Sequence, residues 1–236
     1  MPGTNGPIAI VARPNTVDRQ RIVSPLRIGA GSCGSHLRQS ATSGAARSSP
    51  MLIAPCSSST DIMSGQISTA ELVDGSIISI RPLASGDTDA ILDLYESLTD
   101  EERYLRFFTM RPAHPEEWAR SISEPRSDQC SLGAYSSGKL LGVANYVACQ
   151  QPGYAEVSVV VAHAEHLRGV GTALLRRLGQ IARENGLHRL VAEVLAENHL
   201  MHRVLSDAGW PCALHLEDSV LHVEVDLDAL NSLAER

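Results

Sequence analysis

The sequence predicts a mixed α/β protein with a mostly antiparallel central sheet that contains a single parallel β-α-β unit. A β-meander is indicated by two apolar segments that flank a turn-forming tetrapeptide, Ser136-Ser-Gly-Lys139. The β-α-β unit is indicated by a β-branched run at 156–161, an apolar stripe at helical spacing and a second apolar run at 190–195. This order places the parallel unit near the end of the chain.

One strand and one helix are predicted at the start of the fold. Ser76-Ile-Ile-Ser-Ile-Arg81 is typical of a strand and stops at Pro82, because proline cannot continue a ladder of backbone hydrogen bonds. Asp87 is a suitable N-cap for the helix that follows. The apolar residues of this helix recur at helical spacing: Ile91, Leu92 and Tyr95.

Two further helices are predicted before the meander. Thr99-Asp-Glu-Glu102 matches a capping box, in which each of the two end residues accepts a hydrogen bond from the other's backbone amide. This box predicts a helix that runs through Phe108. Pro115 begins a short helical stretch that reaches Trp118. The meander strands are then expected at 130–135 and 140–147.

The second half of the chain predicts two helices and three strands. The long helix of the β-α-β unit ends before Gly186, because glycine favours the left-handed conformation found after a helix C-terminus. Asn198 is a suitable N-cap for the next helix, which ends at Gly209. A last strand is expected at 220–227, paired with a segment at 212–216. The stripe of the long helix comprises Val170, Leu174, Leu178, Ile181 and Ala182.

Residues 1–62 differ in character from the rest of the chain. They are rich in Ser, Gly, Pro, Ala and Arg and have no sustained hydrophobic period, so they cannot bury enough apolar surface to offset the entropy of ordering. We expect a disordered or mis-assigned N-terminal extension outside the fold. Three interpretations stay open: a transit peptide, a disordered tail, or a start codon assigned too early, with Met63 as the true start. The last interpretation is favoured. Residues 63–236 then form the folded domain.

Composition restricts the class of protein. The chain carries a formal net charge of −7, and residues 63–236 hold fourteen basic against twenty-five acidic residues, a net of −11. This balance argues against a nucleic acid as the main partner and mildly favours a cationic one such as an amine, although an acidic surface also serves solubility alone. No apolar run approaches the length of a membrane span.

Cysteines and histidines show no metal-binding spacing along the chain. The five cysteines form no CxxC pair and the histidines form no HExxH-type pair, so we expect no metal site. Free thiols in a reducing compartment fit this pattern, which predicts a location in the cytoplasm. His163 and His166 are expected to be solvent-exposed loop residues.

The segment that follows Glu156 carries the most informative chemistry. A central strand runs through a short loop into a glycine-containing turn at the start of the long helix. Backbone N–H groups and the positive end of the helix dipole converge there, which is typical of a pyrophosphate site. Gly169 and Gly171 would let the backbone approach the phosphates without a Cβ clash. Arg168 can add positive charge, and Thr172 can add a hydroxyl donor.

Two other phosphate-binding motifs are excluded. A P-loop needs a lysine directly before its Ser or Thr, and the only lysine, Lys139, lies elsewhere. The dinucleotide-binding fingerprint needs a third glycine, and Leu174 stands at that position. Neither a P-loop site nor a Rossmann site is therefore expected.

The hexapeptide His166-Leu-Arg-Gly-Val-Gly171 resembles the central motif of the GNAT acetyltransferase superfamily, Gln/Arg-x-x-Gly-x-Gly/Ala. The surrounding pattern strengthens the likeness: strand Val159-Val-Val161 lies upstream, and a helix, a strand, Ala196-Glu-Asn198 and Gly209-Trp210 follow downstream. The resemblance covers about residues 75–227 and implies the GNAT fold, with acetyl-CoA as the acyl donor. The departure is His166, because the family prefers glutamine or arginine there.

The resemblance also implies which residues bind acetyl-CoA. The strand backbone at Val159, Val160 and Val161 would pair with the pantetheine arm, and Asn198 would lie near that arm. Many family members place a tyrosine, the acid for the leaving thiolate, seven residues after this asparagine. This chain has Leu205 there, so the proton would come from water or another group. The diphosphate would be held by the turn that comprises His166, Leu167, Arg168, Gly169, Val170, Gly171 and Thr172.

Acylation of an amine needs a base, because an alkyl ammonium titrates at about pH 10. Glu156 opens the central strand at the position where some family members carry a catalytic glutamate, and an exposed strand-start carboxylate is the alternative interpretation. Glu193 on the following strand is a second candidate. A backbone N–H near Val159 could stabilise the tetrahedral intermediate.

A narrower resemblance concerns the acceptor. Arg81-Pro-Leu, the segment from Ser97 to Phe108 and the segment from Ala192 to Asn198 are similar to the catalytic domain of bacterial Pat-type protein lysine acetyltransferases. This likeness implies a protein lysine as the acceptor, with acyl-CoA synthetases as one target class. A small-molecule amine acceptor and a non-catalytic acyl-CoA-binding module stay open as alternatives. The sequence does not indicate whether the protein is a monomer or an oligomer.

Overall fold

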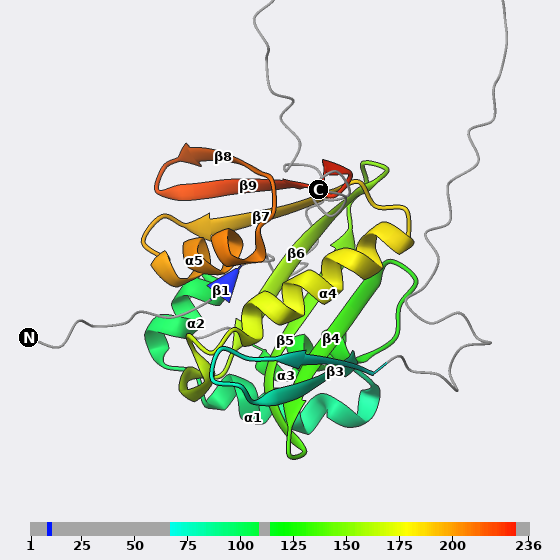
Figure 1. Cartoon of the computed structure of the whole chain (residues 1–236), viewed down its shortest axis with the longest axis vertical. Helices are drawn as coiled ribbons and strands as arrows, with labels where there is room; N and C mark the ends of the chain where they lie inside the picture. Colours follow the sequence, from blue (N-terminus) through cyan, green and yellow to red (C-terminus); the bar gives the residue numbers. More distant parts are fainter. Residues whose placement is uncertain (1–8, 11–66, 109–113, 230–236) are drawn as a thin grey trace, which may run out of the picture. The chain divides into compact units, whose positions relative to one another are not determined.

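The computed structural model describes residues 9–10, 67–108 and 114–229 (Figure 1). The strands are β1 (Ala9–Ile10), β2 (Ser68–Glu71), β3 (Ile77–Pro82), β4 (Gln129–Ser136), β5 (Lys139–Ala148), β6 (Tyr154–Val161), β7 (Arg189–Leu195), β8 (Cys212–Glu217) and β9 (Val220–Asp226). The helices are α1 (Thr88–Glu96), α2 (Asp100–Phe107), α3 (Pro115–Ser123), α4 (Val170–Glu184) and α5 (His199–Ala208), with short 3₁₀ turns η1 (Ser85–Asp87) and η2 (His163–Glu165).

The described strands form one nine-stranded sheet, which confirms the predicted α/β class. Its order is β2-β3-β4-β5-β6-β7-β9-β8, with β1 paired to β6 beside β7. Neighbouring strands run antiparallel except β6 and β7, which are parallel and joined through α4. The single parallel crossover therefore lies where the sequence predicts it.

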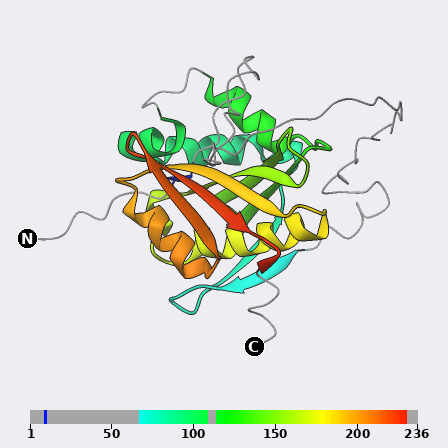
Figure 2. The same ribbon diagram turned by 90° about the horizontal axis from the view of Figure 1, so that it is seen from above.

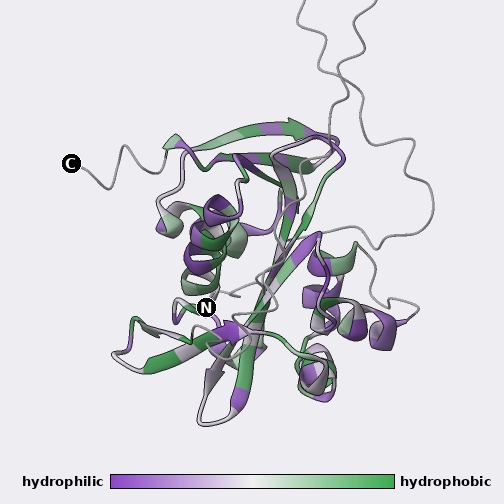
Figure 3. Cartoon of the chain, turned by 90° about the vertical axis from the view of Figure 1, so that its right-hand side faces the viewer, coloured by the Kyte–Doolittle hydropathy of each residue, from purple (hydrophilic) through white to green (hydrophobic). Residues whose placement is uncertain are grey.

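Helices cover both faces of the sheet (Figure 2). Alternate residues of β6 separate the two sides: Val159 packs in a core cluster with α4 and α5, whereas Val160 packs in a second cluster with α1 and α3. Figure 3 shows the mostly hydrophobic strands between the two groups of helices. None of the helices in the described residues combines the length and the apolar character that a membrane span requires.

Local capping signals define two of the helix ends as predicted. The capping box of α2 is confirmed, because Thr99 Oγ1 accepts from the Glu102 N–H at 3.2 Å and Glu102 Oε2 accepts from the Thr99 N–H at 2.6 Å. Asn198 caps α5, and Gly209 follows it in the left-handed conformation, with φ of 70°. Short sequence motifs thus fix the start of α2 and both ends of α5.

Three local expectations need correction. Asp87 precedes α1 but does not cap it with its side chain. Its carboxylate instead lies 2.7 Å from Arg81 Nη2 and accepts the Ala84 N–H at 2.8 Å, so it closes the η1 turn. The third strand includes Pro82 as its last residue, where a missing N–H interrupts no inner bond of the ladder. The second helix ends at Phe107, because Phe108 turns into the left-handed region.

Residues 9–10 are an exception to the expectation that the whole N-terminal extension lies outside the fold. β1 pairs antiparallel with β6, with Ala9 opposite Val160 and Ile10 opposite Val159. Ile10 is β-branched, which favours the extended backbone of this short pairing. The rest of residues 1–62, and the candidate start at Met63, lie outside the described residues.

The cysteines only partly match the expectation of free thiols. Cys149 and Cys212 are free. Cys130 is disulfide-bonded, so the expectation is wrong for this residue. Cys33 and Cys56 lie outside the described residues.

Gly179 allows α4 to approach Trp210 closely, and this contact yields a prediction for stability. A Cβ at Gly179 would lie 2.8 Å from Trp210 Cζ2, which is below any normal contact. We expect Gly179→Ala to lower the free energy of unfolding by about 1–2 kcal/mol, because overpacking outweighs the gain in helix propensity. Urea unfolding at equilibrium measures this loss. Gly86→Ala is the control, since nothing lies within 4 Å of a Cβ there; a gain in stability for Gly179→Ala would contradict the packing argument.

Candidate functional site

The candidate site begins where β6 passes through η2 into α4. Gly169 is the N-cap of α4 and has φ of 97°, a conformation that glycine adopts without strain. The first helical hydrogen bond joins the Ala173 N–H to the Gly169 carbonyl at 2.9 Å. Helix geometry therefore leaves the amides of residues 170–172 directed outward from the helix end. No side chain caps this end and no acidic residue lies in its first turn, so its positive dipole is not offset locally.

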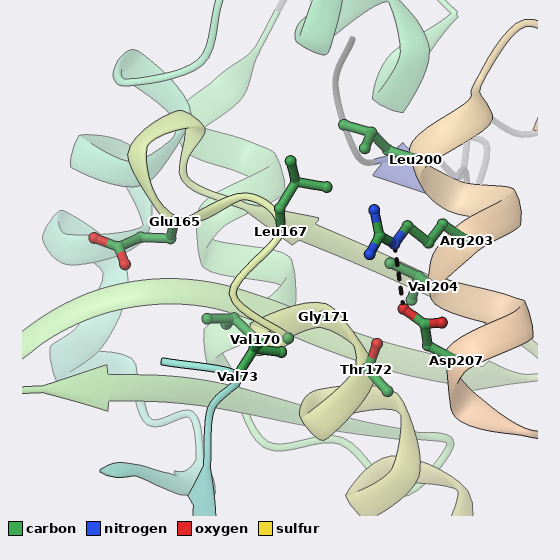
Figure 4. Close-up of a pocket in the computed structure, with 11 residues that line it drawn as sticks. Val73, Glu165, Leu167, Val170, Gly171, Thr172, Leu200, Arg203, Val204 and Asp207 are labelled. Atoms are coloured by element: carbon green, nitrogen blue, oxygen red, sulfur yellow. Dashed lines mark ion pairs between the residues drawn. The ribbon is translucent and has the colours of Figure 1, made fainter. Parts of the chain in front are cut away.

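A pocket lies directly at this helix end, between α4 and α5 (Figure 4). Figure 4 shows the Arg203 side chain pointing from α5 toward the loop that carries Leu167, while Glu165 points to the far side. Arg203 Nε lies 3.6 Å from Asp207 Oδ2. The pocket is lined by Val73, Glu165, Leu167, Gly169, Val170, Gly171, Thr172, Leu200, Arg203, Val204 and Asp207. Amides, one guanidinium and an apolar wall thus meet in one cavity.

Five of the seven residues predicted for the diphosphate turn line this pocket. They are Leu167, Gly169, Val170, Gly171 and Thr172. Arg168 and His166 are not among the lining residues, and both contact other parts of the protein. Arg203, which the motif analysis missed, supplies the positive charge at this pocket from α5. Its helical spacing from Leu200 is the signal in the sequence that could have placed it on the face toward α4.

Arg168 links the turn to the hairpin of β2 and β3. Its Nε donates to Asp74 at 2.8 Å, its Nη2 donates to Ser76 Oγ at 2.9 Å, and its Nη1 pairs with Glu165. The Ser76 hydroxyl and amide, together with Arg168, lower the pKa of Asp74 to about 2. The Arg168 carbonyl also accepts the Val73 N–H at 3.0 Å. In this structure the guanidinium therefore holds the turn in place, and a contact with a diphosphate stays a prediction.

His166 is largely buried, which corrects the expectation of an exposed loop histidine, whereas His163 is exposed. His166 Nε2 lies 3.0 Å from the Val161 carbonyl, and its Nδ1 lies 3.5 Å from Glu102 Oε1. Burial lowers the pKa of His166. The first residue of the motif thus faces α2 and supports the turn from behind.

The parallel pairing of β6 and β7 is short. It covers Tyr154, Ala155 and Glu156 of β6, whereas β7 pairs with β9 on its other side along its whole length. Residues 157–161 of β6 therefore diverge from β7 and turn their backbone toward the space between the strands. Among the described residues, β1 pairs with this edge, opposite Val159 and Val160. The predicted pantetheine contacts at Val159, Val160 and Val161 lie along this edge.

Asn198 lies across this divergence, at the junction of β7 and α5. It is 1% exposed, and its Oδ1 accepts the Met201 N–H at 3.0 Å. The structure therefore gives Asn198 a capping role, while a contact with pantetheine stays a prediction. Leu205 is buried in the core cluster that includes α4 and α5, so this position offers no acid for a thiolate.

Glu156 lies on the face of β6 that is directed toward α2 and α3. On the same face, Ser158 Oγ accepts from Arg106 Nη2 at 2.9 Å and donates to Asn145 Oδ1 at 2.7 Å. Burial lowers the pKa of Arg106 to about 10, and the charge of Glu156 opposes this shift. Arg106 consequently stays protonated at neutral pH.

Sequence patterns did not identify Arg106. This buried cation interacts electrostatically with Glu156, the candidate base. It is 2% exposed, and its guanidinium carbon lies 4.8 Å from the Phe107 ring centroid and 5.8 Å from that of Trp118. Its spacing of four residues from Glu102 places both charges on one face of α2. Glu193, the second candidate base, faces a different group, with its Oε1 3.9 Å from His222 Nδ1.

The comparisons with known proteins agree with this geometry. A family model described as the acetyltransferase (GNAT) family matches residues 91–210. The solved GNAT domain of S. lividans PAT is 30% identical with a TM-score of 0.61, over 68% of this chain and 96% of that domain. A curated acetyltransferase of Pseudomonas aeruginosa is 27% identical over 158 residues, which are 64% of this chain and 85% of that protein.

A more distant likeness concerns the fold alone. A putative acetyltransferase from Salmonella typhimurium, solved with its cofactor acetyl-CoA, is 20% identical with a TM-score of 0.51. The match covers 64% of this chain and 94% of that one.

The helix end should bind an anion, and inorganic pyrophosphate is the simplest probe. We expect it to shift the amide NMR signals of residues 169–172. Gly171→Asp should abolish these shifts by charge repulsion, and its circular dichroism spectrum checks the fold, because a Cβ at this buried position would contact the side chains of Val161 and Val204. Gly171→Ala is the control, since its Cβ would lie in ordinary contact 3.5 Å from Val161 Cγ2. Wild-type shifts in the aspartate variant would place the anion elsewhere.

Proposed function

Because this chain belongs to the GNAT acetyltransferase family, we propose that it transfers the acetyl group of acetyl-CoA directly to an amine, and that this amine is a protein lysine. The observation that carries the proposal is the junction of two binding features. The pocket at the α4 N-terminus adjoins the edge of β6 that diverges from β7. A diphosphate with an extended arm matches this pair of features.

The pocket residues fit the diphosphate of acetyl-CoA. The amides of residues 170–172 and the dipole of α4 favour negative charge, and Arg203 adds a cation from α5. Two carboxylates also line the pocket, but Asp207 pairs with Arg203 and Glu165 pairs with Arg168. These pairs are close to neutral, so the attraction for a diphosphate comes mainly from the amides and the dipole of α4, with Arg203 as an additional N–H donor.

The diverging edge of β6 fits the pantetheine arm. An extended chain with amide groups can add to a strand edge through backbone hydrogen bonds. Residues Val159 to Val161 offer such an edge, since β7 pairs only with the first three residues of β6. Acetyl-CoA supplies an activated thioester, and in this proposal a β6 amide near Val159 would stabilise oxyanion charge on its carbonyl.

Glu156 is the proposed base on this strand. An amine must lose a proton to attack, and a carboxylate can accept that proton directly or through one water molecule. Arg106 lies close enough for its charge to interact with that of Glu156, and Ser158 and Asn145 fix the guanidinium in place. Arg106 is thus a positioning residue for the base. Protonation of the leaving thiolate falls to water or another group, because Leu205 cannot supply it.

The proposed acceptor is a protein lysine, for instance on an acyl-CoA synthetase of the bacterial cytoplasm. Support comes from the 30% identity to the GNAT domain of S. lividans PAT, which this chain matches over 96% of that domain. The net charge of −11 in residues 63–236 attracts a cationic acceptor of either kind. Turnover of lysine peptides against a panel of small amines tests the choice. Preference for a small amine would replace the lysine proposal, and acetyl-CoA binding without any turnover would support a sensing module.

Replacement of the proposed base should separate catalysis from binding. We expect Glu156→Gln to lower kcat for the best acceptor by about 10²–10⁴-fold, because the amide cannot accept the proton. The dissociation constant of acetyl-CoA should stay unchanged, since Glu156 does not line the diphosphate pocket. Glu193→Gln is the matched control, with a decrease of only a few-fold. A larger loss in Glu193→Gln than in Glu156→Gln would transfer the role of base to Glu193.

β1 should compete with the pantetheine arm for the edge of β6. Both would pair with the backbone at Val159 and Val160, so only one can bind there at a time. We expect a chain without residues 1–14 to bind acetyl-CoA several-fold more tightly than the full-length chain, because no bound segment must first be displaced. Calorimetric titration of both proteins measures the difference. Equal or weaker binding after the truncation would show that β1 and acetyl-CoA do not share this edge.

A further inference from the structure

Three potential metal ligands meet behind the diphosphate turn, on the side of α2. Glu102 Oε1 lies 2.8 Å from Nδ1 of His163 and 3.5 Å from Nδ1 of His166. One ligand atom from each of the three side chains lies within 4.8 Å of the other two. A zinc ion with bonds of about 2.0–2.1 Å holds tetrahedral ligands about 3.3 Å apart, which is close to these separations.

The hydrogen bonds around the cluster favour a cation at its centre. His166 Nε2 lies 3.0 Å from the Val161 carbonyl, an acceptor, so this nitrogen carries the proton. In the neutral ring, Nδ1 then has a lone pair and faces Glu102 Oε1, which is also an acceptor. The Glu102 side chain is 1% exposed, so water cannot readily relieve this opposition. His163 Nδ1 can donate to Oε1 at 2.8 Å, but a cation between Oε1 and His166 Nδ1, either a proton or a metal ion, is needed to satisfy both of these atoms.

We propose that Glu102, His163 and His166 bind a zinc ion whose fourth position is open to solvent. The orientation of two ligands is already fixed, as metal sites require. The Val161 carbonyl holds the His166 ring, and the Thr99 N–H holds Glu102 Oε2 at 2.6 Å, which leaves Oε1 for the metal. His163 has a side chain that is 60% exposed and provides the path of entry.

The chemistry of the ligands selects the metal class. Two imidazole nitrogens and one carboxylate oxygen suit Zn²⁺, whereas Mg²⁺ and Ca²⁺ prefer shells made of oxygen. The spacing of cysteines and histidines along the chain predicts no metal site. Glu102 and His163 are separated by 61 residues and meet only through the packing of α2 against the loop after β6.

Zinc would link α2 to the loop that leads into the proposed acyl-CoA site. Glu102 belongs to the first turn of α2, and His163 and His166 belong to the loop that leads into the diphosphate pocket. A metal that binds only the folded protein stabilises it by mass action. Zinc should therefore raise the melting temperature without acetyl-CoA, so this inference can fail or succeed independently of the proposed function.

Calorimetric titration of Zn²⁺ into the full-length chain, freed of metal with a chelator, tests the site. We expect one saturable site per chain, a rise of several degrees in the melting temperature and no comparable effect of Mg²⁺. His166→Gln and Glu102→Gln should each weaken zinc binding at least about tenfold. Glutamine at position 102 can still complete the capping box of α2, so this variant should keep the fold.

Two further variants make the outcome decisive. His163→Ala removes an exposed ligand and should weaken zinc binding with little effect on folding. His188→Gln is the matched control, because His188 Nδ1 lies 3.1 Å from Asp228 Oδ2 in an exposed pair elsewhere. Zinc binding that is lost in the three ligand variants and kept in His188→Gln supports the site. No saturable binding to the wild type, or unchanged binding in the ligand variants, overturns it.

Discussion

The divergence of β6 from β7 after Glu156 is the constraint on which the rest of the site depends. Two parallel strands that stayed paired would use the backbone of Val159 to Val161 within the sheet. Because β7 pairs with β6 only as far as Glu156, that backbone lies beyond the β7 pairing, next to the N-terminus of α4, and the short strand β1 pairs with part of it. One irregularity in the sheet thus creates both a place for an extended arm and access to the helix end.

The turn at this helix end is held from two sides, so the pocket is formed before any ligand binds. Arg168 ties it to Asp74 and Ser76 in the hairpin of β2 and β3. His166, the first residue of the turn, contacts Glu102 in α2 and the Val161 carbonyl. A rigid turn keeps the amides of α4 aimed at one point, which reduces the entropy that binding would otherwise cost.

Sequence reasoning succeeded where the signal is local. The capping box at Thr99, the cap at Asn198 and the glycine turn before α4 each depend on a few consecutive residues, and the β-α-β pattern depends on periodicity. It failed where packing brings distant residues together. Arg106 near Glu156 and β1 on β6 are products of tertiary contact between distant segments, and the helical spacing of Arg203 gives its face of α5 but not the pocket that this face meets. Arg168 illustrates a further limit of sequence patterns. They predict its position in the turn, but they do not predict that its side chain pairs with the carboxylates of Asp74 and Glu165.

We propose that the α4 helix end and the edge of β6 form one binding site for acetyl-CoA. Hydrogen–deuterium exchange of the full-length chain, with and without saturating acetyl-CoA, tests it most directly because it reports on individual backbone amides. Protection is expected to concentrate in residues 159–161 and 169–172. Protection confined to other segments, or no binding by the folded protein, would contradict it.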